Sequence, residues 1–289
     1  MPELPEVETV KRGLAKSIVG KTIADFSCDW HKLINKPAAK YKQTIKDLKI
    51  LSVERRAKML IVKLSKGLNI LVHLKMTGQL VYRGKSKCVV GGHPIKEGAN
   101  CLPNKFTHVT FSFTDGSQLY YNDVRKFGWL RLYTDVELEK ALAAKKMGPE
   151  PLSKEFSLKY LQQLTKTGKN RKRVKQFLME NQNLVGVGNI YSDEVCFYAG
   201  VMPDKPVEKL TTQQIKKIHE GIQKILKAAI KAQGTTVSDY RNADGSAGGY
   251  AKYLKVYQRY GEKCYRCKAK VVRMKIGGRT SHYCPQCQK

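Results

Sequence analysis

The first six residues of the chain, Met1-Pro2-Glu3-Leu4-Pro5-Glu6, have the composition of a covalent catalyst. Removal of Met1 would make Pro2 the N-terminus and turn its nitrogen into a free secondary amine. With an aldehyde, such an amine forms an iminium whose fixed positive charge withdraws electrons. An α-amino group has a pKa of about 8, so about a tenth of it is nucleophilic at pH 7. Glu3 and Glu6 are close enough in the sequence to move protons for it.

The same residues also suit the beginning of a helix, which is the commoner meaning of this pattern. Proline is favoured in the first helical turn, and acidic side chains are stabilised at the positive N-terminal end of the helix. Glu6 in particular can be read as a helix-end charge. The rest of the chain must therefore decide between a helix start and a catalytic N-terminus.

Four cysteines near the C-terminus predict a metal site. They form the pairs Cys264-x2-Cys267 and Cys284-x2-Cys287, with 16 residues between the pairs. Each pair suits tetrahedral Zn²⁺, and the intervening length fits a β-hairpin. Four thiolates leave no open coordination position, so we expect one structural zinc ion. Two disulfides are the alternative, which a reducing compartment disfavours.

The charge of the chain predicts a polyanionic partner. It carries 54 Lys and Arg against 24 Asp and Glu, a net charge of +30, which favours nucleic acid first and an anionic membrane second. No apolar run approaches the roughly 20 residues needed to span a bilayer, and no signal-peptide pattern begins the chain. We therefore expect an intracellular protein. Its other cysteines are expected to be free thiols: Cys28, Cys88, Cys101 and Cys196.

Hydrophobic patterns divide the chain into three domains. A short helix is expected after Pro5, and from about residue 20 to 133 short β-branched runs predict a β-sandwich or barrel with a hairpin at residues 114–117. Residues 84–104 are interpreted as a surface insertion. Helices are expected from residue 153 to 233, one of them with a capping box at Thr211 and Gln214, followed by a mobile loop at residues 238–249. The predicted fold class is multidomain α+β: a β-sandwich over 1–133, a helical domain over 134–250 and a zinc-finger hairpin over 251–289.

Seven motifs follow one another along the chain in a fixed order. They are residues 1–9 (MPELPEVET), 55–58 (RRAK), 73–78 (HLKMTG), 123–128 (DVRKFG), 187–191 (VGNIY), 233–236 (QGTT) and the terminal CPQCQK. Together they resemble the family of bacterial formamidopyrimidine-DNA glycosylases, from residue 2 to residue 289. The resemblance implies a β-sandwich, a helix–two-turns–helix domain and a zinc-finger hairpin, in agreement with the patterns above.

The resemblance also implies a reaction. A member of this family removes oxidised purines such as 8-oxoguanine and formamidopyrimidines from double-stranded DNA, then cleaves the abasic site by β,δ-elimination. Pro2 is implied as the nucleophile that forms a Schiff base, Glu3 and Lys58 as further catalytic residues, and Glu6 as their support. A monomer in the bacterial cytoplasm, associated with the nucleoid, is expected.

Further residues match the DNA contacts of the family. Three are implied to bind phosphate, as Lys58 also is: His73, Asn189 and Arg279. Three others are implied to fill the void left by the extruded base: Met76, Arg125 and Phe127, of which Arg125 would bond the orphaned cytosine. Without the resemblance each has a plainer explanation, since Lys58 on a strand would face solvent, His73 would be a core histidine and Arg279 a solvated turn residue. The loop over 235–250 is implied to cap the extruded base.

Three departures from the family and two rival functions remain at this point. Lys75 occupies a position that is often glycine in the family, Val124 occupies one that is often proline, and the insertion at residues 84–104 is longer than usual. These departures put loop geometry and lesion preference in question. An endonuclease VIII-like glycosylase would share the fold but prefer oxidised pyrimidines. A zinc-ribbon nucleic-acid binder without catalysis would account for the charge and the cysteines alone, but it would have no reason to form a covalent adduct through Pro2.

Overall fold

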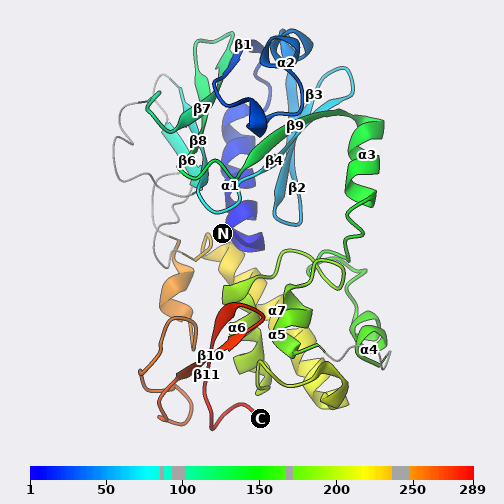
Figure 1. The fold of residues 1–289 in the computed structure, drawn as a ribbon, viewed down its shortest axis with the longest axis vertical. Helices are drawn as coiled ribbons and strands as arrows, with labels where there is room; N and C mark the ends of the chain where they lie inside the picture. The colour runs from blue at the N-terminus through cyan, green and yellow to red at the C-terminus, as the bar shows by residue number, and fades with distance from the viewer. Residues whose placement is uncertain (85–87, 93–101, 167–171, 236–247) are drawn as a thin grey trace. The chain divides into compact units, whose positions relative to one another are not determined.

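The computed structural model describes residues 1–84, 88–92, 102–166, 172–235 and 248–289. The capping loop expected at 235–250, Cys101 and the side chain of Cys88 lie wholly or mostly outside the described residues. The chain forms two compact units (Figure 1). One comprises residues 1–145 and 232–249, and the other residues 146–231 and 250–289. The division into three domains at residues 133 and 250 stays a prediction.

Two antiparallel sheets build the first unit (Figure 1). The five-stranded sheet has the order β1 (Ile23–Cys28), β7 (Thr107–Phe113), β8 (Gln118–Asp123), β5 (Gly78–Arg83) and β6 (Cys88–Gly92). The four-stranded sheet has the order β2 (Ile50–Arg56), β3 (Met59–Leu64), β4 (Leu68–His73) and β9 (Trp129–Thr134). Apolar side chains from both sheets form one buried core. The predicted β-sandwich and the hairpin at residues 114–117 are confirmed.

Helix α1 (Leu4–Ile18) joins the two sheets, since it contacts β5 and β6 of one and β2 and β3 of the other. Val7, Val10 and Leu14 are buried at the spacing that predicted the helix. A Cβ on Gly91 of β6 would lie 2.8 Å from Val10, so this strand approaches the helix closely. The interpretation of residues 84–104 as a surface insertion was therefore wrong for β6, which is a strand of the sheet.

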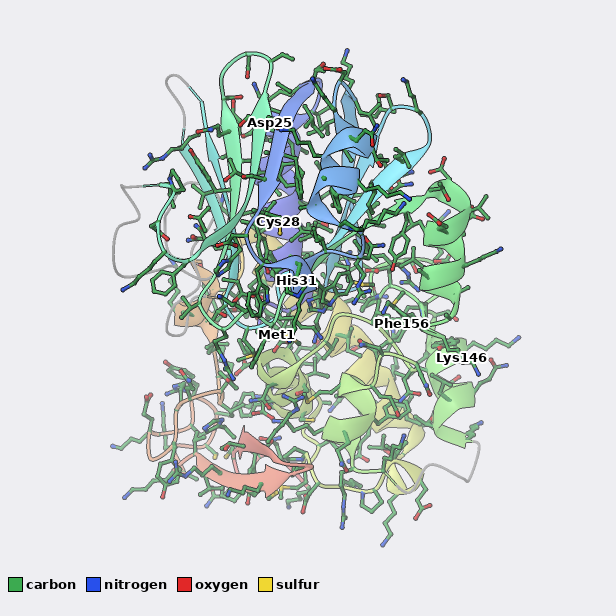
Figure 2. All side chains as sticks on the ribbon, turned by 45° about the horizontal axis from the view of Figure 1, so that its top comes forward. Met1, Asp25, Cys28, His31, Lys146 and Phe156 are labelled. Atoms are coloured by element: carbon green, nitrogen blue, oxygen red, sulfur yellow. The ribbon has the colours of Figure 1, made fainter. Side chains whose placement is uncertain are left out.

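Smaller elements complete the first unit. They are η1 (His31–Leu33), α2 (Ala38–Ile45) and α3 (Asp135–Ala143). Figure 2 marks Asp25 and Cys28 on β1 and His31 in the short turn that follows it. Stacking of Phe26 on Tyr41, with ring centroids 4.5 Å apart, attaches α2 to the five-stranded sheet. This unit carries the loops at residues 74–77 and 124–128, which hold several of the candidate residues.

The second unit is helical, as predicted, with a β-hairpin near its end. Its helices are α4 (Leu158–Lys166), α5 (Val174–Met179), α6 (Asn189–Ala199) and α7 (Thr212–Lys231), with short turns η2 (Val207–Lys209) and η3 (Tyr250–Tyr253). The hairpin consists of β10 (Val272–Ile276) and β11 (Arg279–Tyr283). Thr211 and Gln214 cap α7 reciprocally, with both hydrogen bonds at 3.2 Å. In the part of the chain that the structure describes, no helix has the length and apolarity to cross a membrane.

Candidate functional site

Two buried carboxylates follow Pro2 at the beginning of α1. Glu3 and Glu6 are 3% and 2% exposed. Glu6 accepts a hydrogen bond from the backbone N–H of Glu3 at 2.9 Å and another from Thr235 at 2.8 Å. Glu6 therefore caps the helix and also fixes the segment that precedes residues 236–247. The helix-start interpretation and a supporting role at the N-terminus are compatible, because one carboxylate makes both contacts.

Lys58 lies in the two-residue turn between β2 and β3, so its placement on a strand was wrong. The preceding Ala57 has a φ of 55°, a left-handed conformation that only a turn requires. Arg55 holds this turn, since its guanidinium donates to the Ala57 carbonyl at 2.8 Å and to Glu8 of α1 at 3.1 Å. Lys58 itself is only 9% exposed. A solvent-facing strand lysine is thereby excluded.

Glu8 anchors this arrangement from α1. Burial by itself would raise the pKa of Glu8, but hydrogen bonds from Arg12 and Arg55 and the charge of Lys11 bring it below its ordinary value. The side chain is therefore a carboxylate at neutral pH, and it fixes Arg55 under the turn that carries Lys58.

His73 ends β4 and is a donor through only one nitrogen. Its Nδ1 accepts the backbone N–H of Lys75 at 3.0 Å, which places the ring proton on Nε2. Burial, together with the positive charges of Lys75, Lys58 and Lys145, lowers the pKa of His73 to about 3. The imidazole is neutral at pH 7 and offers Nε2–H as a donor, the form in which it can bind a phosphate oxygen.

Met76, Arg125 and Phe127 project from two loops, residues 74–77 and 124–128, which we call the wedge loops. Met76 is 41% and Phe127 50% exposed, large values for apolar side chains. The Arg125 guanidinium lies over the Phe127 ring, 4.5 Å from its centroid. Lys75 has a φ of 53°, which explains physically why glycine would be preferred at its position. The lysine keeps the turn at the cost of backbone strain.

Asn189 is the first residue of α6, after the glycine-rich stretch that predicted a phosphate-binding helix start. Its Nδ2 is 3.5 Å from the Tyr257 hydroxyl, and its buried Oδ1 has no hydrogen-bond partner among the residues that the structure describes. A side-chain amide held this loosely can turn towards a ligand.

Arg279 begins β11 directly after a tight turn. Gly277 and Gly278 have φ values of 54° and 74°, as a two-residue type I′ hairpin turn requires. A Cβ on Gly277 would lie 2.6 Å from the Gln176 side chain, so the turn is seated against α5. The exposed Arg279 is thus carried by a turn of defined geometry.

The four predicted cysteines converge. Their Sγ atoms all lie within 4.8 Å of one another. The Cys264–Cys287 and Cys267–Cys284 sulfur pairs are 3.8 and 3.4 Å apart, which is too far for a disulfide bond. Zn–S bonds of about 2.3 Å in a tetrahedron place sulfurs about 3.8 Å apart. The cluster therefore fits one structural zinc ion with no open position.

Residues 255–289, which carry the four cysteines, are called the zinc module here. Two adjacent acids of α6, Asp193 and Glu194, hold this module to the helices, and we call them the clamp. The motifs of the sequence did not reveal them. Asp193 is fully buried and accepts hydrogen bonds from Lys175 (2.6 Å), Ser281 (2.6 Å) and the His282 N–H (2.8 Å). Glu194 accepts the backbone N–H groups of residues 255–257 at 2.9–3.0 Å. Burial raises the pKa of Glu194, although these N–H groups oppose the shift. Two consecutive acids in a mostly apolar helix were the available signal.

The candidate residues thus fall into two groups, each within one compact unit. The first unit carries Pro2, Glu3, Glu6, Lys58, His73 and the wedge residues. The second carries Asn189, Arg279 and the zinc cysteines.

Three family models match successive parts of the chain. Residues 1–130 match the formamidopyrimidine-DNA glycosylase N-terminal domain, residues 147–241 the H2TH domain of the same enzymes, and residues 261–289 a zinc finger found in FPG and IleRS. The chain belongs to the formamidopyrimidine-DNA glycosylase family. The resemblance seen in the sequence is confirmed.

Curated relatives and solved structures in this family match over the whole length. Formamidopyrimidine-DNA glycosylase of Pelotomaculum thermopropionicum is 38% identical, covering 100% of this chain and 99% of its own, and that of Bacillus licheniformis is 39% identical with 100% of both covered. A Lactococcus lactis FPG variant in complex with Fapy-dG-containing DNA has a TM-score of 0.88 at 34% identity, with 100% of both chains covered. Lactococcus lactis Fpg with abasic-site DNA gives the same score over 99% of both.

Proposed function

We propose that this family member is a bifunctional DNA glycosylase and abasic-site lyase that removes oxidised purines from duplex DNA. The observation that carries the proposal is Pro2 directly before the N-cap residue of α1, with Glu3 and Glu6 buried beside it in the sequence. The chain also matches formamidopyrimidine-DNA glycosylases along its full length. The net charge of +30 supports a DNA substrate. We further propose that the protein acts as a monomer on nucleoid DNA in the bacterial cytoplasm.

Once Met1 is removed, the Pro2 nitrogen attacks C1′ of the damaged nucleotide and displaces the base. Glu3 handles the proton at the sugar oxygen as the ring opens, and an iminium forms between Pro2 and C1′. The iminium acidifies the proton on C2′, whose loss expels the 3′ phosphate. A second elimination expels the 5′ phosphate, and water releases the sugar fragment from Pro2.

DNA contacts divide between the two units. In the first, Lys58 and the Nε2–H of His73 bind phosphates near the lesion, and Met76, Arg125 and Phe127 occupy the void left by the extruded base. Extrusion costs a few kcal/mol of lost stacking, which side chains that enter the void offset. In the second, Asn189 and Arg279 bind phosphates, and Cys264, Cys267, Cys284 and Cys287 hold zinc, which keeps the hairpin folded and takes no part in the chemistry.

Borohydride trapping tests the proposal. Sodium borohydride added during reaction with an 8-oxoguanine duplex should reduce the iminium to a stable protein–DNA adduct. Protein that retains Met1, or whose Pro2 is acylated, is the matched control and should give no adduct. Normal trapping with a blocked N-terminus would exclude Pro2 as the nucleophile. Tight binding of lesion DNA without trapping in the unblocked protein would favour the non-catalytic binder.

A panel of lesion duplexes separates the purine enzyme from the endonuclease VIII-like alternative. Oxidised pyrimidines belong in it, because a Lactococcus lactis Fpg structure contains DNA with an oxidised pyrimidine. We expect 8-oxoguanine and formamidopyrimidines to be excised faster than oxidised pyrimidines under single-turnover conditions. The reverse order would favour the endonuclease VIII-like function.

A further inference from the structure

The two wedge loops are neighbours at both of their ends. Residues 74–77 connect β4 to β5, and residues 124–128 connect β8 to β9, so each loop crosses from one sheet to the other. β5 pairs with β8, with Gly78 opposite Asp123, and β4 pairs with β9, with His73 opposite Trp129. The two crossovers therefore leave and re-enter the sandwich side by side.

A buried carboxylate lies between these crossovers. Asp123, which is fully buried, accepts hydrogen bonds from the backbone N–H of Gly128 at 2.7 Å and of Arg125 at 3.2 Å. It also accepts the Thr77 hydroxyl, which comes from the other loop. Thr77 Oγ1 in turn accepts the Arg125 N–H at 3.1 Å. Asp123 and Thr77 thus join the loop of Met76 directly to the loop of Arg125 and Phe127.

The Tyr121 hydroxyl is the second connection between the loops. It donates to Asp123 at 3.4 Å, and the side chain is fully buried. A Cβ on Gly128 would lie 1.6 Å from this oxygen, and a Cβ on Gly78 would lie 2.6 Å from it. One phenol oxygen is therefore enclosed between Gly128 of one wedge loop and Gly78, the residue of β5 that directly follows the other, and a Cβ fits at neither position.

We propose that Thr77, Tyr121 and Asp123, which we call the clasp, are positioning residues that make the two wedge loops act as one rigid body. The proposal rests on the proposed function, in which Met76, Arg125 and Phe127 must enter the base stack together. Burial keeps the clasp residues away from the surface to which DNA would bind, since Tyr121 and Asp123 are fully buried and Thr77 is 9% exposed. Their effect is to fix where Arg125 meets the opposite base, and so to set the selection of the base pair.

Isosteric substitutions of the clasp give a matched test. Thr77→Val removes only the hydroxyl and leaves Asp123 short of one donor, whereas Thr77→Ser keeps it. We expect Thr77→Val to slow excision of 8-oxoguanine opposite cytosine about tenfold, the size of one unmet buried hydrogen bond, and to flatten the preference among opposite bases. Thr77→Ser should stay within about twofold of the native enzyme. Cleavage of a preformed abasic site should change little in either variant, since the residues of the reaction are untouched.

Tyrosine offers a second matched pair within the same sandwich. Tyr121→Phe removes the enclosed hydroxyl. Tyr41→Phe removes an equally buried hydroxyl that has no hydrogen-bond partner within the described ranges of the chain. We expect only Tyr121→Phe to weaken opposite-base selection. The clasp proposal would be overturned if the two phenylalanine variants selected opposite bases equally well. It would also be overturned if Thr77→Val and Thr77→Ser did so.

Hydrogen exchange separates a failure of the clasp from a failure of the proposed function. The Asp123 carboxylate accepts the backbone N–H groups of Arg125 and Gly128. Asparagine offers one amide oxygen as an acceptor, and its NH2 group is a donor. In Asp123→Asn the Arg125 and Gly128 amides should therefore exchange with solvent at least about tenfold faster. Unchanged protection at both amides would overturn the clasp whether or not the enzyme is active. Absence of excision and trapping in the native protein would instead refute the function while leaving this structural result intact.

Discussion

The sandwich and the zinc module both hold the backbone near an exposed arginine in place, but they do so with different interactions. Each presents an exposed arginine, Arg125 on a loop and Arg279 directly after a hairpin turn. A fully buried aspartate holds the backbone at Arg125 in the sandwich, and another holds it at His282, three residues after Arg279, in the zinc module. In the part of the chain that the structure describes, the hydrogen bonds to the Asp123 carboxylate come from hydroxyl and N–H groups. Asp193 additionally pairs with the buried ammonium of Lys175. The two aspartates have different partners because the apolar cores around them differ in size.

The wedge loops emerge from a core of nearly thirty buried residues. Their ends are fixed by four strands, so the clasp needs to order only a few residues between them. Among the described residues, the core at the zinc module has five buried residues, of which two are cysteines and one, Phe197, comes from α6. A hairpin with so little apolar burial requires a metal ion and a clamp to hold its shape. We therefore expect the zinc module to depend on single interactions far more than the wedge loops do.

Loss of zinc should have the largest effect. Structural zinc contributes folding free energy of about 10 kcal/mol in small finger modules. Cys267→Ser should release the metal and unfold the hairpin, with loss of DNA affinity as Arg279 loses its position, while the sandwich stays folded. Metal content, hydrogen exchange in each unit and binding to a lesion duplex measure these effects. Full DNA affinity in zinc-free protein would contradict the dependence of the module on its metal.

Breaking the clamp should come next. Asp193→Ala leaves the Lys175 ammonium buried without its carboxylate, and removal of one partner of a buried pair costs about 3–5 kcal/mol. Urea unfolding should show a loss of this order, and DNA affinity should fall for all duplexes alike. The double variant Lys175→Met, Asp193→Leu is the control, and it should recover much of the stability but not the contacts to Ser281 and His282. If Asp193→Ala lowered the free energy of unfolding by less than about 1 kcal/mol, the zinc module would not depend on the clamp more than the wedge loops depend on the clasp.

Local patterns in the sequence predicted the elements whose causes are local. The 3.6-residue spacing of Val7, Val10 and Leu14 predicted α1, and the Thr211–Gln214 pair predicted the cap of α7. The cysteine spacing predicted the metal cluster, because two pairs of knuckle cysteines leave little conformational freedom. In each case the deciding interactions lie within a few residues or within one rigid chemical arrangement.

Features that depend on distant partners could not be predicted in this way. Thr77 and Asp123 are 46 residues apart, and Ser281 and Asp193 are 88 apart. Each of these side chains passes for an ordinary polar residue until the sheets and helices are assembled. Lys58 was misplaced because its turn uses an alanine at a positive φ, without the Gly or Asn that marks such turns.

Loss of Arg125 should change the preference among opposite bases, whereas loss of Arg279 should change the general affinity for DNA. This difference sharpens the comparison between the wedge loop and the zinc-module hairpin. Arg125→Ala leaves the polar edge of the orphaned cytosine unsatisfied, at a cost of about 1–3 kcal/mol. Excision of 8-oxoguanine should fall most opposite cytosine, and the preference among the four opposite bases should flatten. Arg279→Ala should weaken all duplexes equally and reduce the salt dependence of binding by about one unit of slope. An equal loss against all four bases in Arg125→Ala would reduce its role to backbone contact or packing.

The smallest effect expected is a pH dependence confined to the sandwich. Burial and the charges of Lys75, Lys58 and Lys145 lower the pKa of His73 to about 3, whereas in the unfolded chain it is about 6.5. At about pH 7.5 and above the imidazole is almost entirely neutral in both states, so this group does not affect stability. As the pH falls below 6.5, the unfolded chain takes up a proton that the folded sandwich does not, so stability decreases progressively towards pH 3. By pH 5.5 the loss from this group should be about 1.4 kcal/mol.

His73→Gln isolates this contribution, because glutamine keeps a hydrogen-bonding side chain but does not titrate. Urea unfolding of the native protein and the variant between pH 7.5 and 5.5, followed by a probe in the sandwich, should show a shallower pH dependence in the variant. Abasic-site cleavage at pH 7.5 should fall in the variant through weaker phosphate binding, with the chemistry at Pro2 retained. Parallel pH profiles of the two proteins would mean that His73 is protonated as easily in the folded sandwich as in the unfolded chain. The neutral Nε2–H donor assigned to it would then be wrong, and its charge would be what a phosphate binds.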